Sequence, residues 1–232
     1  MVELVVATRN EHKILEIQEI LGTAFRCIPL SSFPDAPPLI EDGDTFAANA
    51  TKKAVQLARW LARAPGTKLR TPKDERYVLA DDSGLEVAAL NGAPGVHSAR
   101  FAAWDTGRPG NSSDAENNAK LLRLLKDVPV GKRTARFRCV LALTPAPNKV
   151  SPNGSSVCYA DELELQTELF DGACEGRIDF APSGHKGFGY DPLFVPNGYQ
   201  QSFAELGEET KNRLSHRSQA LAKLRRRLVS GP

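Results

Sequence analysis

The first segment whose residue types could do chemistry is Thr-Arg-Asn-Glu-His-Lys at residues 8–13. It follows an apolar run at residues 4–7 and precedes apolar residues at helical spacing, so it lies where a strand passes into a helix. Unpaired N–H groups at a helix N-terminus favour an anion, whereas the helix dipole disfavours Lys13 there unless an anion binds beside it. We therefore regard this segment as a candidate phosphate site, with a solvated lysine as the alternative.

Acidic residues gather in two further places. The first is the segment with Glu41, Asp42 and Asp44, and the second is the pair Asp81-Asp82. The pair comes at the end of the apolar run at 77–80, where carboxylates contribute nothing to packing and are costly to bury. A metal or proton-transfer role is one interpretation, and solvated turn acids are the other. Consecutive strand side chains point to opposite faces, so only one of the pair is expected to face a given site. Oxygen ligands alone would suit magnesium.

Two further candidate segments lie in the C-terminal half. Residues 184–192 place three glycines around two aromatic side chains and Asp191, which allows close backbone approach and stacking of a base. Lys211 and the run Ser-His-Arg at 215–217 form a polar cluster that opens the last helix. Taken separately, the first segment could simply plug a core, and the second is better explained as a helix cap with solvated charges.

Several other kinds of function lack support in the sequence. The chain of 232 residues carries 30 Lys+Arg and 28 Asp+Glu, so its net charge of +2 gives no field that requires nucleic acid or a membrane surface. Its four histidines show no HExxH or paired spacing for a transition metal, and no GxSxG or GxxxxGK[ST] motif is present. The N-terminus lacks the features of a signal peptide, so we expect a cytoplasmic protein with reduced cysteines.

These segments must be positioned by a mixed set of helices and strands. We expect a strand at 4–7, a helix opening at Asn10, and a second helix that starts at Thr45 and ends before Pro65. On this second helix Asn49, Lys53 and Gln56 share a face apart from the apolar stripe. A strand is expected at 77–80, neighbouring antiparallel strands at 135–141 and 163–169, and a closing helix around 220–228. The pattern predicts one α/β domain, residues 1–232, with a mixed sheet.

In this order, the segments closely resemble the inosine triphosphate pyrophosphatase family. The resemblance covers residues 4–221 and rests on these pieces: Thr8-Arg9-Asn10 with Lys13, Glu41-x-Gly43-x-Thr45-Phe46 with Asn49-Ala50 and Lys53-Ala54, Ala80-Asp81-Asp82-Ser83-Gly84-Leu85, Gly92-Ala93-Pro94-Gly95 with Ser98-Ala99-Arg100, Gly187-Phe188-Gly189-Tyr190-Asp191-Pro192, and Ser215-His216-Arg217. It implies an elongated mixed sheet with flanking helices, two lobes around a central substrate cleft, and a homodimer.

The same resemblance implies hydrolysis of inosine, deoxyinosine and xanthosine triphosphates to the monophosphate and pyrophosphate. Mg²⁺ would be held by Glu41 and Asp82, and Asp82 would also accept the proton of the attacking water. The implied substrate-binding residues are Thr8, Arg9, Asn10, Glu11, His12, Lys13, Ser83, Phe188, Gly189, Tyr190, Asp191, Lys211, His216 and Arg217. Ala48 stands where the family often has a glutamate, and the loops at 64–76 and 145–157 are longer than usual.

Two rival functions remain open. A pyrophosphatase for modified pyrimidine triphosphates would use the same chemistry with a smaller base pocket. A nucleotide-sensing or RNA-binding module is suggested by the basic runs 68–70 and 225–227, although a solvated face explains both runs as well. We expect no nucleic-acid partner and no membrane partner.

Overall fold

The computed structural model describes residues 1–64, 76–105, 107, 110–146 and 158–230. Its strands form a single six-stranded sheet in the order β2-β1-β3-β4-β5-β6. The strands are β1 (Val2–Val6), β2 (Phe25–Pro29), β3 (Arg76–Val87), β4 (Thr134–Pro145), β5 (Glu168–Ile178) and β6 (Phe194–Pro196). β1 pairs in parallel with β2 and β3, whereas β5 and β6 pair antiparallel, so the sheet is mixed as predicted.

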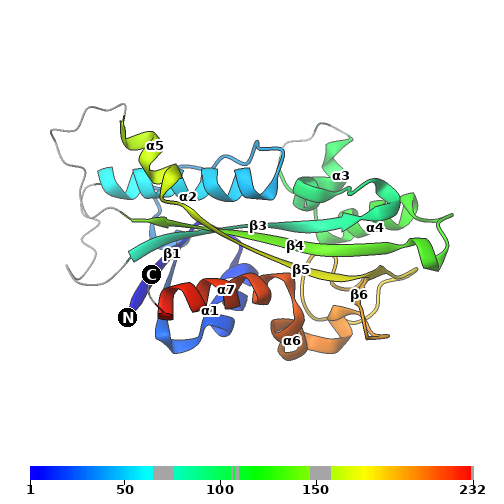
Figure 1. The fold of residues 1–232 in the computed structure, drawn as a ribbon. Helices are drawn as coiled ribbons and strands as arrows, with labels where there is room; N and C mark the ends of the chain where they lie inside the picture. Colours follow the sequence, from blue (N-terminus) through cyan, green and yellow to red (C-terminus); the bar gives the residue numbers. More distant parts are fainter. Residues whose placement is uncertain (65–75, 106, 108–109, 147–157, 231–232) are drawn as a thin grey trace. The chain divides into compact units, whose positions relative to one another are not determined.

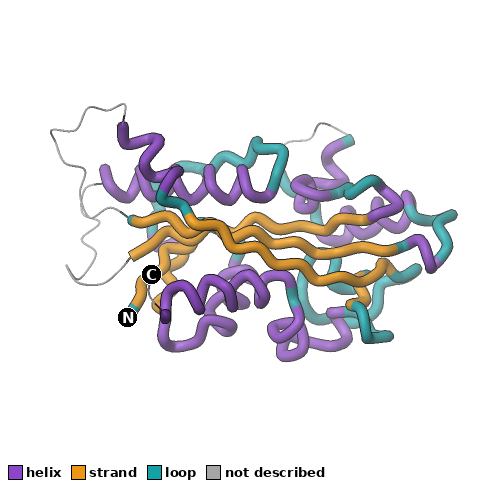
Figure 2. The backbone as a smooth tube through the Cα atoms, in the orientation of Figure 1, coloured by secondary structure: helices purple, strands orange, loops and turns teal. Residues whose placement is uncertain are grey.

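Seven α-helices accompany these strands in the described part of the chain (Figures 1 and 2). They are α1 (Glu11–Leu21), α2 (Phe46–Arg63), α3 (Phe101–Trp104), α4 (Asp114–Leu124), α5 (Cys158–Leu165), α6 (Phe203–Leu214) and α7 (His216–Ser230). The expected helix starts are confirmed, because Asn10 caps α1 and Thr45 caps α2 through side-chain oxygens that accept backbone N–H groups. No helix among the described residues is both long and apolar enough to cross a bilayer.

Contacts within the chain divide it into two compact units, and the first comprises residues 1–82, 140–171 and 220–232. Its parallel strands are apolar along their length, and Leu4, Val5, Val78 and Leu79 are fully buried. Helices cover both faces of these strands, with α1 and α7 on one side and α2 on the other (Figure 1). Burial on both faces is the usual reason for such continuous apolar strands.

The second unit comprises residues 83–139 and 172–219. Its core joins the ends of β3, β4 and β5 to α4 and α6, and includes Val87, Leu121, Phe137, Ile178 and Phe203. Within this unit α3 and α4 lie on one face of the strands and α6 on the other (Figure 1). β3, β4 and β5 each contribute residues to both units. The predicted α/β class is confirmed, while the single domain and the two lobes around a cleft stay predictions.

The strand predicted at 163–169 is wrong over its first half. Residues 158–165 form helix α5, and β5 begins only at Glu168, although it does neighbour β4 as expected. The alternation of Leu and Glu over four residues is too short to exclude a helix, and both residue types are good helix formers. Leu165 is 84% exposed, so the alternation does not mark a buried face here.

The prediction that Asp81 and Asp82 end a strand is also wrong, because β3 continues to Val87 and places them near its middle. Gly84 does not break the strand. A Cβ at Gly84 would lie 2.4 Å from the Ser98 side-chain oxygen and 2.5 Å from the Gly95 carbonyl oxygen. Glycine is therefore required here for close approach of the neighbouring backbone rather than for a turn.

Candidate functional site

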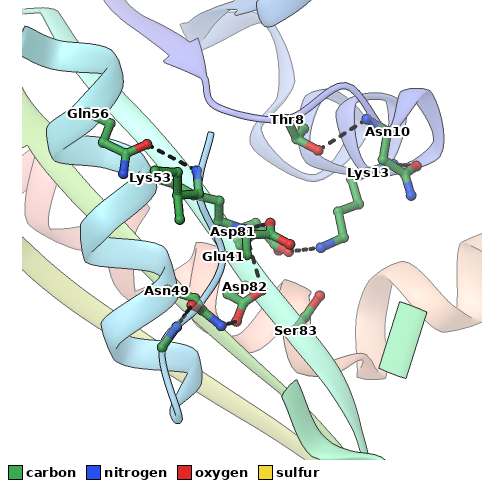
Figure 3. A network of polar contacts seen from close by, with 12 residues as sticks. Thr8, Asn10, Lys13, Glu41, Asn49, Lys53, Gln56, Asp81, Asp82 and Ser83 are labelled. Carbon is green, nitrogen blue, oxygen red and sulfur yellow. Dashed lines mark hydrogen bonds and ion pairs between the residues drawn. The ribbon is translucent and has the colours of Figure 1, made fainter. Parts of the chain in front are cut away.

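The pleat of β3 turns its two central carboxylates toward different helices. Asp81 Oδ1 lies 2.5 Å from the Nζ of Lys13 on α1, whereas Asp82 Oδ2 accepts a hydrogen bond of 3.1 Å from the Nδ2 of Asn49 on α2 (Figure 3). The two residues are 1% and 7% exposed. Since α1 and α2 cover opposite faces of β3, the two side chains point to opposite faces, as expected for consecutive strand residues.

The segment at residues 8–13 is a turn held by its own side chains. Thr8 Oγ1 accepts a hydrogen bond from the N–H of Asn10, and Asn10 Oδ1 accepts one from the N–H of Lys13. Arg9 donates to the carbonyl oxygen of Ala36, while Glu11 and His12 are exposed on the first turn of α1. The side chain of Lys13 is only 16% exposed, so it is not the solvated lysine of the alternative interpretation.

The polar face of α2 holds the acidic segment that precedes it. Gln56 Oε1 accepts from the N–H of Ile40, and Asn49 Oδ1 accepts from the N–H of Gly43 at 2.7 Å. Between them, the Nζ of Lys53 lies 2.6 Å from Glu41 Oε1. The expected shared face of these three α2 residues is confirmed, and it packs on the segment that carries Glu41 (Figure 3).

Lys53 is the charged centre of this cluster. Its Nζ donates to the carbonyl oxygen of Asp81 at 2.7 Å and lies 3.4 Å from Asp82 Oδ1, and the residue is 4% exposed. Burial by itself lowers the pKa of Lys53, but the nearby carboxylates of Asp82 and Glu41 outweigh it and raise this pKa above its usual value. Lys53 therefore stays charged, which allows it to bind an anion.

Burial has the larger effect on Asp82. It raises the pKa of this carboxyl above its usual value, although the ammonium groups of Lys53 and Lys13 oppose the change. A carboxylate with a raised pKa is a better proton acceptor than an ordinary surface aspartate. Because Asn49 holds one oxygen of Asp82, the orientation of the other oxygen is fixed as well.

The donor atoms around Asp82 fit a magnesium ion. Glu41 and Asp82 contact the same ammonium group, so their carboxylates are near each other, and the Glu41 side chain is 43% exposed. Mg²⁺ commonly takes one or two carboxylates and completes its shell with water and phosphate oxygens. No cluster of three or more His, Cys, Asp or Glu residues that could hold a metal is present in the described ranges.

The second unit brings together most of the residues expected to recognise the nucleoside. Lys211 Nζ lies 2.7 Å from Asp191 Oδ2 and 4.3 Å from the centre of the Phe188 ring. The same Asp191 oxygen accepts the N–H of Phe188 at 2.9 Å. Lys211 and Asp191 are 5% and 2% exposed, so this cluster is not the solvated helix cap of the alternative interpretation.

The start of α7 adds two buried side chains to this group. Arg217 is 1% exposed, donates to the Ser83 hydroxyl at 3.0 Å, and has its guanidinium carbon 6.0 Å from the Phe188 ring centre. The His216 ring stacks on Phe137 at 4.9 Å. Tyr190 lies in the apolar core and donates its hydroxyl to the carbonyl oxygen of Ser98, so its ring is used in packing.

Sequence reasoning named neither Lys53 nor Asn49 as site residues, although both belong to matched family segments. The available signal was their shared polar face on an otherwise apolar helix, which a solvated surface would also have explained. Of the two basic runs, 68–70 lies outside the described residues. In the other run, Arg227 is 2.8 Å from Glu168, while Arg225 and Arg226 are exposed.

Comparisons with known proteins identify relatives of this chain. A model of the Ham1 family matches residues 4–227. The chain is 44% identical over 225 residues to the dITP/XTP pyrophosphatase of Shouchella clausii, covering 97% of this chain and 96% of that protein. The corresponding protein of Geobacter sulfurreducens is also 44% identical, over 97% and 96% of the two chains. A solved HAM1 protein from Coxiella burnetii superposes with a TM-score of 0.74 at 36% identity over all of both chains.

Proposed function

The chain belongs to the Ham1 family, and on that premise we propose that it hydrolyses non-canonical purine nucleoside triphosphates. The substrates are the triphosphates of inosine, deoxyinosine and xanthosine, and the products are the nucleoside monophosphate and pyrophosphate. The observation that carries this proposal is the cluster in which Lys13 and Lys53 meet the carboxylates of β3. Lys53 lies 3.4 Å from the buried Asp82 carboxylate, and Lys13 contacts Asp81 beside it; such positive charges would stabilise the charge that develops when a phosphate anhydride is hydrolysed.

Binding of the triphosphate falls to residues of the first unit. Lys13 keeps part of its side chain exposed, so its ammonium can turn from Asp81 to a phosphate oxygen, and the dipole of α1 favours an anion at this end of the helix. Lys53 supplies a second positive charge. Glu41 and Asp82 would hold Mg²⁺, which when bound neutralises charge on the departing pyrophosphate.

Asp82 accepts the proton of the attacking water. The water attacks the α-phosphorus, because only cleavage of the α–β bond yields the monophosphate and pyrophosphate together. Burial raises the pKa of Asp82 and so strengthens it as a base, while Asn49 keeps the carboxylate in one orientation. This role needs no covalent intermediate on the protein.

Recognition of the base falls to residues of the second unit. The Phe188 ring offers an apolar face, and Arg217 and His216 offer donors at the start of α7. Inosine and xanthosine carry a 6-keto acceptor where adenosine carries a 6-amino donor. A site built of donors therefore rejects adenine, because buried donors would face each other.

A panel of nucleotides tests this proposal. Incubation with inosine, xanthosine, adenosine, guanosine and pyrimidine triphosphates, with and without Mg²⁺, is followed by quantifying monophosphate and pyrophosphate. We expect the largest kcat/KM for the inosine and xanthosine forms and activity only with the metal. Equal kcat/KM for adenosine and inosine triphosphates would contradict the base specificity, and higher values for modified pyrimidines would favour the rival substrate class. Salt-dependent RNA binding without turnover would favour the binding module.

The family resemblance also leads us to propose that the chain works as a homodimer. Sedimentation equilibrium measures this directly. A single species of 25.2 kDa at the concentration used for the activity assay would contradict it.

A further inference from the structure

The loop at residues 187–191 carries Phe188 on a backbone that needs outside support. Gly187 and Gly189 both adopt positive φ angles, 76° and 64°. Position 187 requires glycine for a second reason, because a Cβ there would lie 2.2 Å from Asp191 Oδ2. Glycine peptides have the widest conformational freedom of any residue, so a loop with two of them keeps one shape only if its polar groups are held.

Helix α4 holds the central peptide groups of this loop at two points. Asp114 Oδ2 accepts the N–H of Gly189 at 2.6 Å, and Asn118 Nδ2 donates to the carbonyl oxygen of Gly189 at 3.0 Å. Residues four apart lie one above the other on a helix, so one face of α4 contacts both polar groups of a single residue.

The helix that provides these two contacts is itself well fixed. Ser113 and Glu116 form a complete capping box at its start. On another face, Asn117 accepts the N–H of Ala102 and donates to the carbonyl oxygen of Ala99. These bonds restrain α4 against the chain that precedes it, so the positions of Asp114 and Asn118 are set before any ligand binds.

We propose that Asp114 and Asn118 are positioning residues for nucleoside recognition, an inference that rests on the proposed function. Phe188 immediately precedes the clamped Gly189, and its ring lies 4.3 Å from the ammonium of Lys211. With Gly189 fixed, this ring is presented to the base in one orientation. Neither positioning residue touches the reacting phosphates, so they act on substrate binding and not on the chemical step.

Steady-state kinetics of Asp114→Ala and Asn118→Ala with inosine triphosphate and Mg²⁺ test this inference. We expect KM to rise about fivefold in each variant, the change that loss of one net hydrogen bond usually causes, with little change in kcat. Asp114→Asn should recover most of that rise, because its amide oxygen can still accept the Gly189 N–H. Arg123→Ala, an exposed change later on α4, is the matched control and should behave as the unaltered protein.

Amide hydrogen exchange supplies a second readout that does not depend on turnover. Exchange at the Gly189 N–H should be faster in both alanine variants and unaltered in Arg123→Ala. Unchanged KM in stably folded alanine variants of an active enzyme would overturn the inference and leave the proposed function intact. A fall in kcat at constant KM would also overturn it. Absence of turnover in the unaltered protein would instead refute the proposed function, and the positioning role with it.

Discussion

Replacing Asp82 by asparagine removes a charge and a proton acceptor without changing the shape of the side chain. In the structure, Asp82 Oδ2 accepts from Asn49 and Oδ1 lies 3.4 Å from Lys53 Nζ. An asparagine at this position can keep the bond from Asn49 through its amide oxygen. Its NH₂ group then faces the Lys53 ammonium, so the variant loses an attraction and places a donor against a cation.

The expected loss of stability is modest. Breaking a buried ion pair typically costs about 3–5 kcal/mol because a charge is left uncompensated. Lys53 still contacts Glu41 at 2.6 Å and the Asp81 carbonyl oxygen at 2.7 Å in this variant, and the buried carboxylate no longer pays its own desolvation. We therefore expect the free energy of unfolding to fall by about 1–2 kcal/mol, the ordinary range for a point substitution.

The expected loss of activity is much larger. A general base contributes about 10²- to 10⁴-fold to a rate, and under the proposed mechanism a metal ligand would be lost in the same substitution. We expect kcat for inosine triphosphate to fall at least about 100-fold, measured as released pyrophosphate with saturating Mg²⁺.

The matched control is Asp42→Asn, the same chemical change in a neighbouring acidic segment. The Asp42 side chain is 63% exposed and contacts Lys52, so its loss should leave both turnover and stability close to those of the unaltered protein. Urea unfolding of both variants shows whether they are folded under assay conditions. Near-normal kcat in a folded Asp82→Asn protein would remove Asp82 from the mechanism and refute the reasoning.

Three further substitutions or treatments have definite expected outcomes. Lys13→Met should lower turnover at least about tenfold and the free energy of unfolding by about 2–3 kcal/mol, because Asp81 is left charged and buried. Adding Asp81→Asn should restore stability in urea unfolding but not turnover, and recovery of both would contradict the phosphate role of Lys13. Arg133→Met should lower the free energy of unfolding by about 3 kcal/mol or more, because the Arg133 guanidinium donates to the carbonyl oxygens of Leu125, Ile178 and Asp179. Lys132→Met, at an exposed neighbouring position, is the control, and equal urea midpoints for the two variants would refute this structural role of Arg133. Burial raises the pKa of the Cys27 and Cys174 thiols to about 11. Labelling of these thiols at pH 8 should therefore be far slower in the native protein than in urea, and equal rates would contradict their burial.

Patterns among residues that are close together in the chain were enough to predict part of the fold. The cap at Asn10, the cap at Thr45 and the helical spacing at 220–228 each involve residues within a few positions of one another. Such local signals survive without tertiary context, and all three helices are found where they were expected. The order of the matched segments likewise indicated the family directly.

Local patterns failed where they were short or where packing decided the outcome. Four alternating residues at 162–165 were too few to separate a strand from α5. β3 continues through Asp81, Asp82 and Gly84, and at Gly84 the Gly95 carbonyl oxygen and the Ser98 side chain approach the strand, a contact that no local spacing records.

The sequence by itself determined which residue types were available for the site, and the tertiary structure decided how they were paired. Asp81 meets Lys13 across 68 positions, and Lys211 on α6 meets Asp191 in the loop at 187–191. A lysine on a helix looks the same in sequence whether it is solvated or buried against a carboxylate. Only the packing of distant strands and helices removes water from these charges, and that burial fixes their partners.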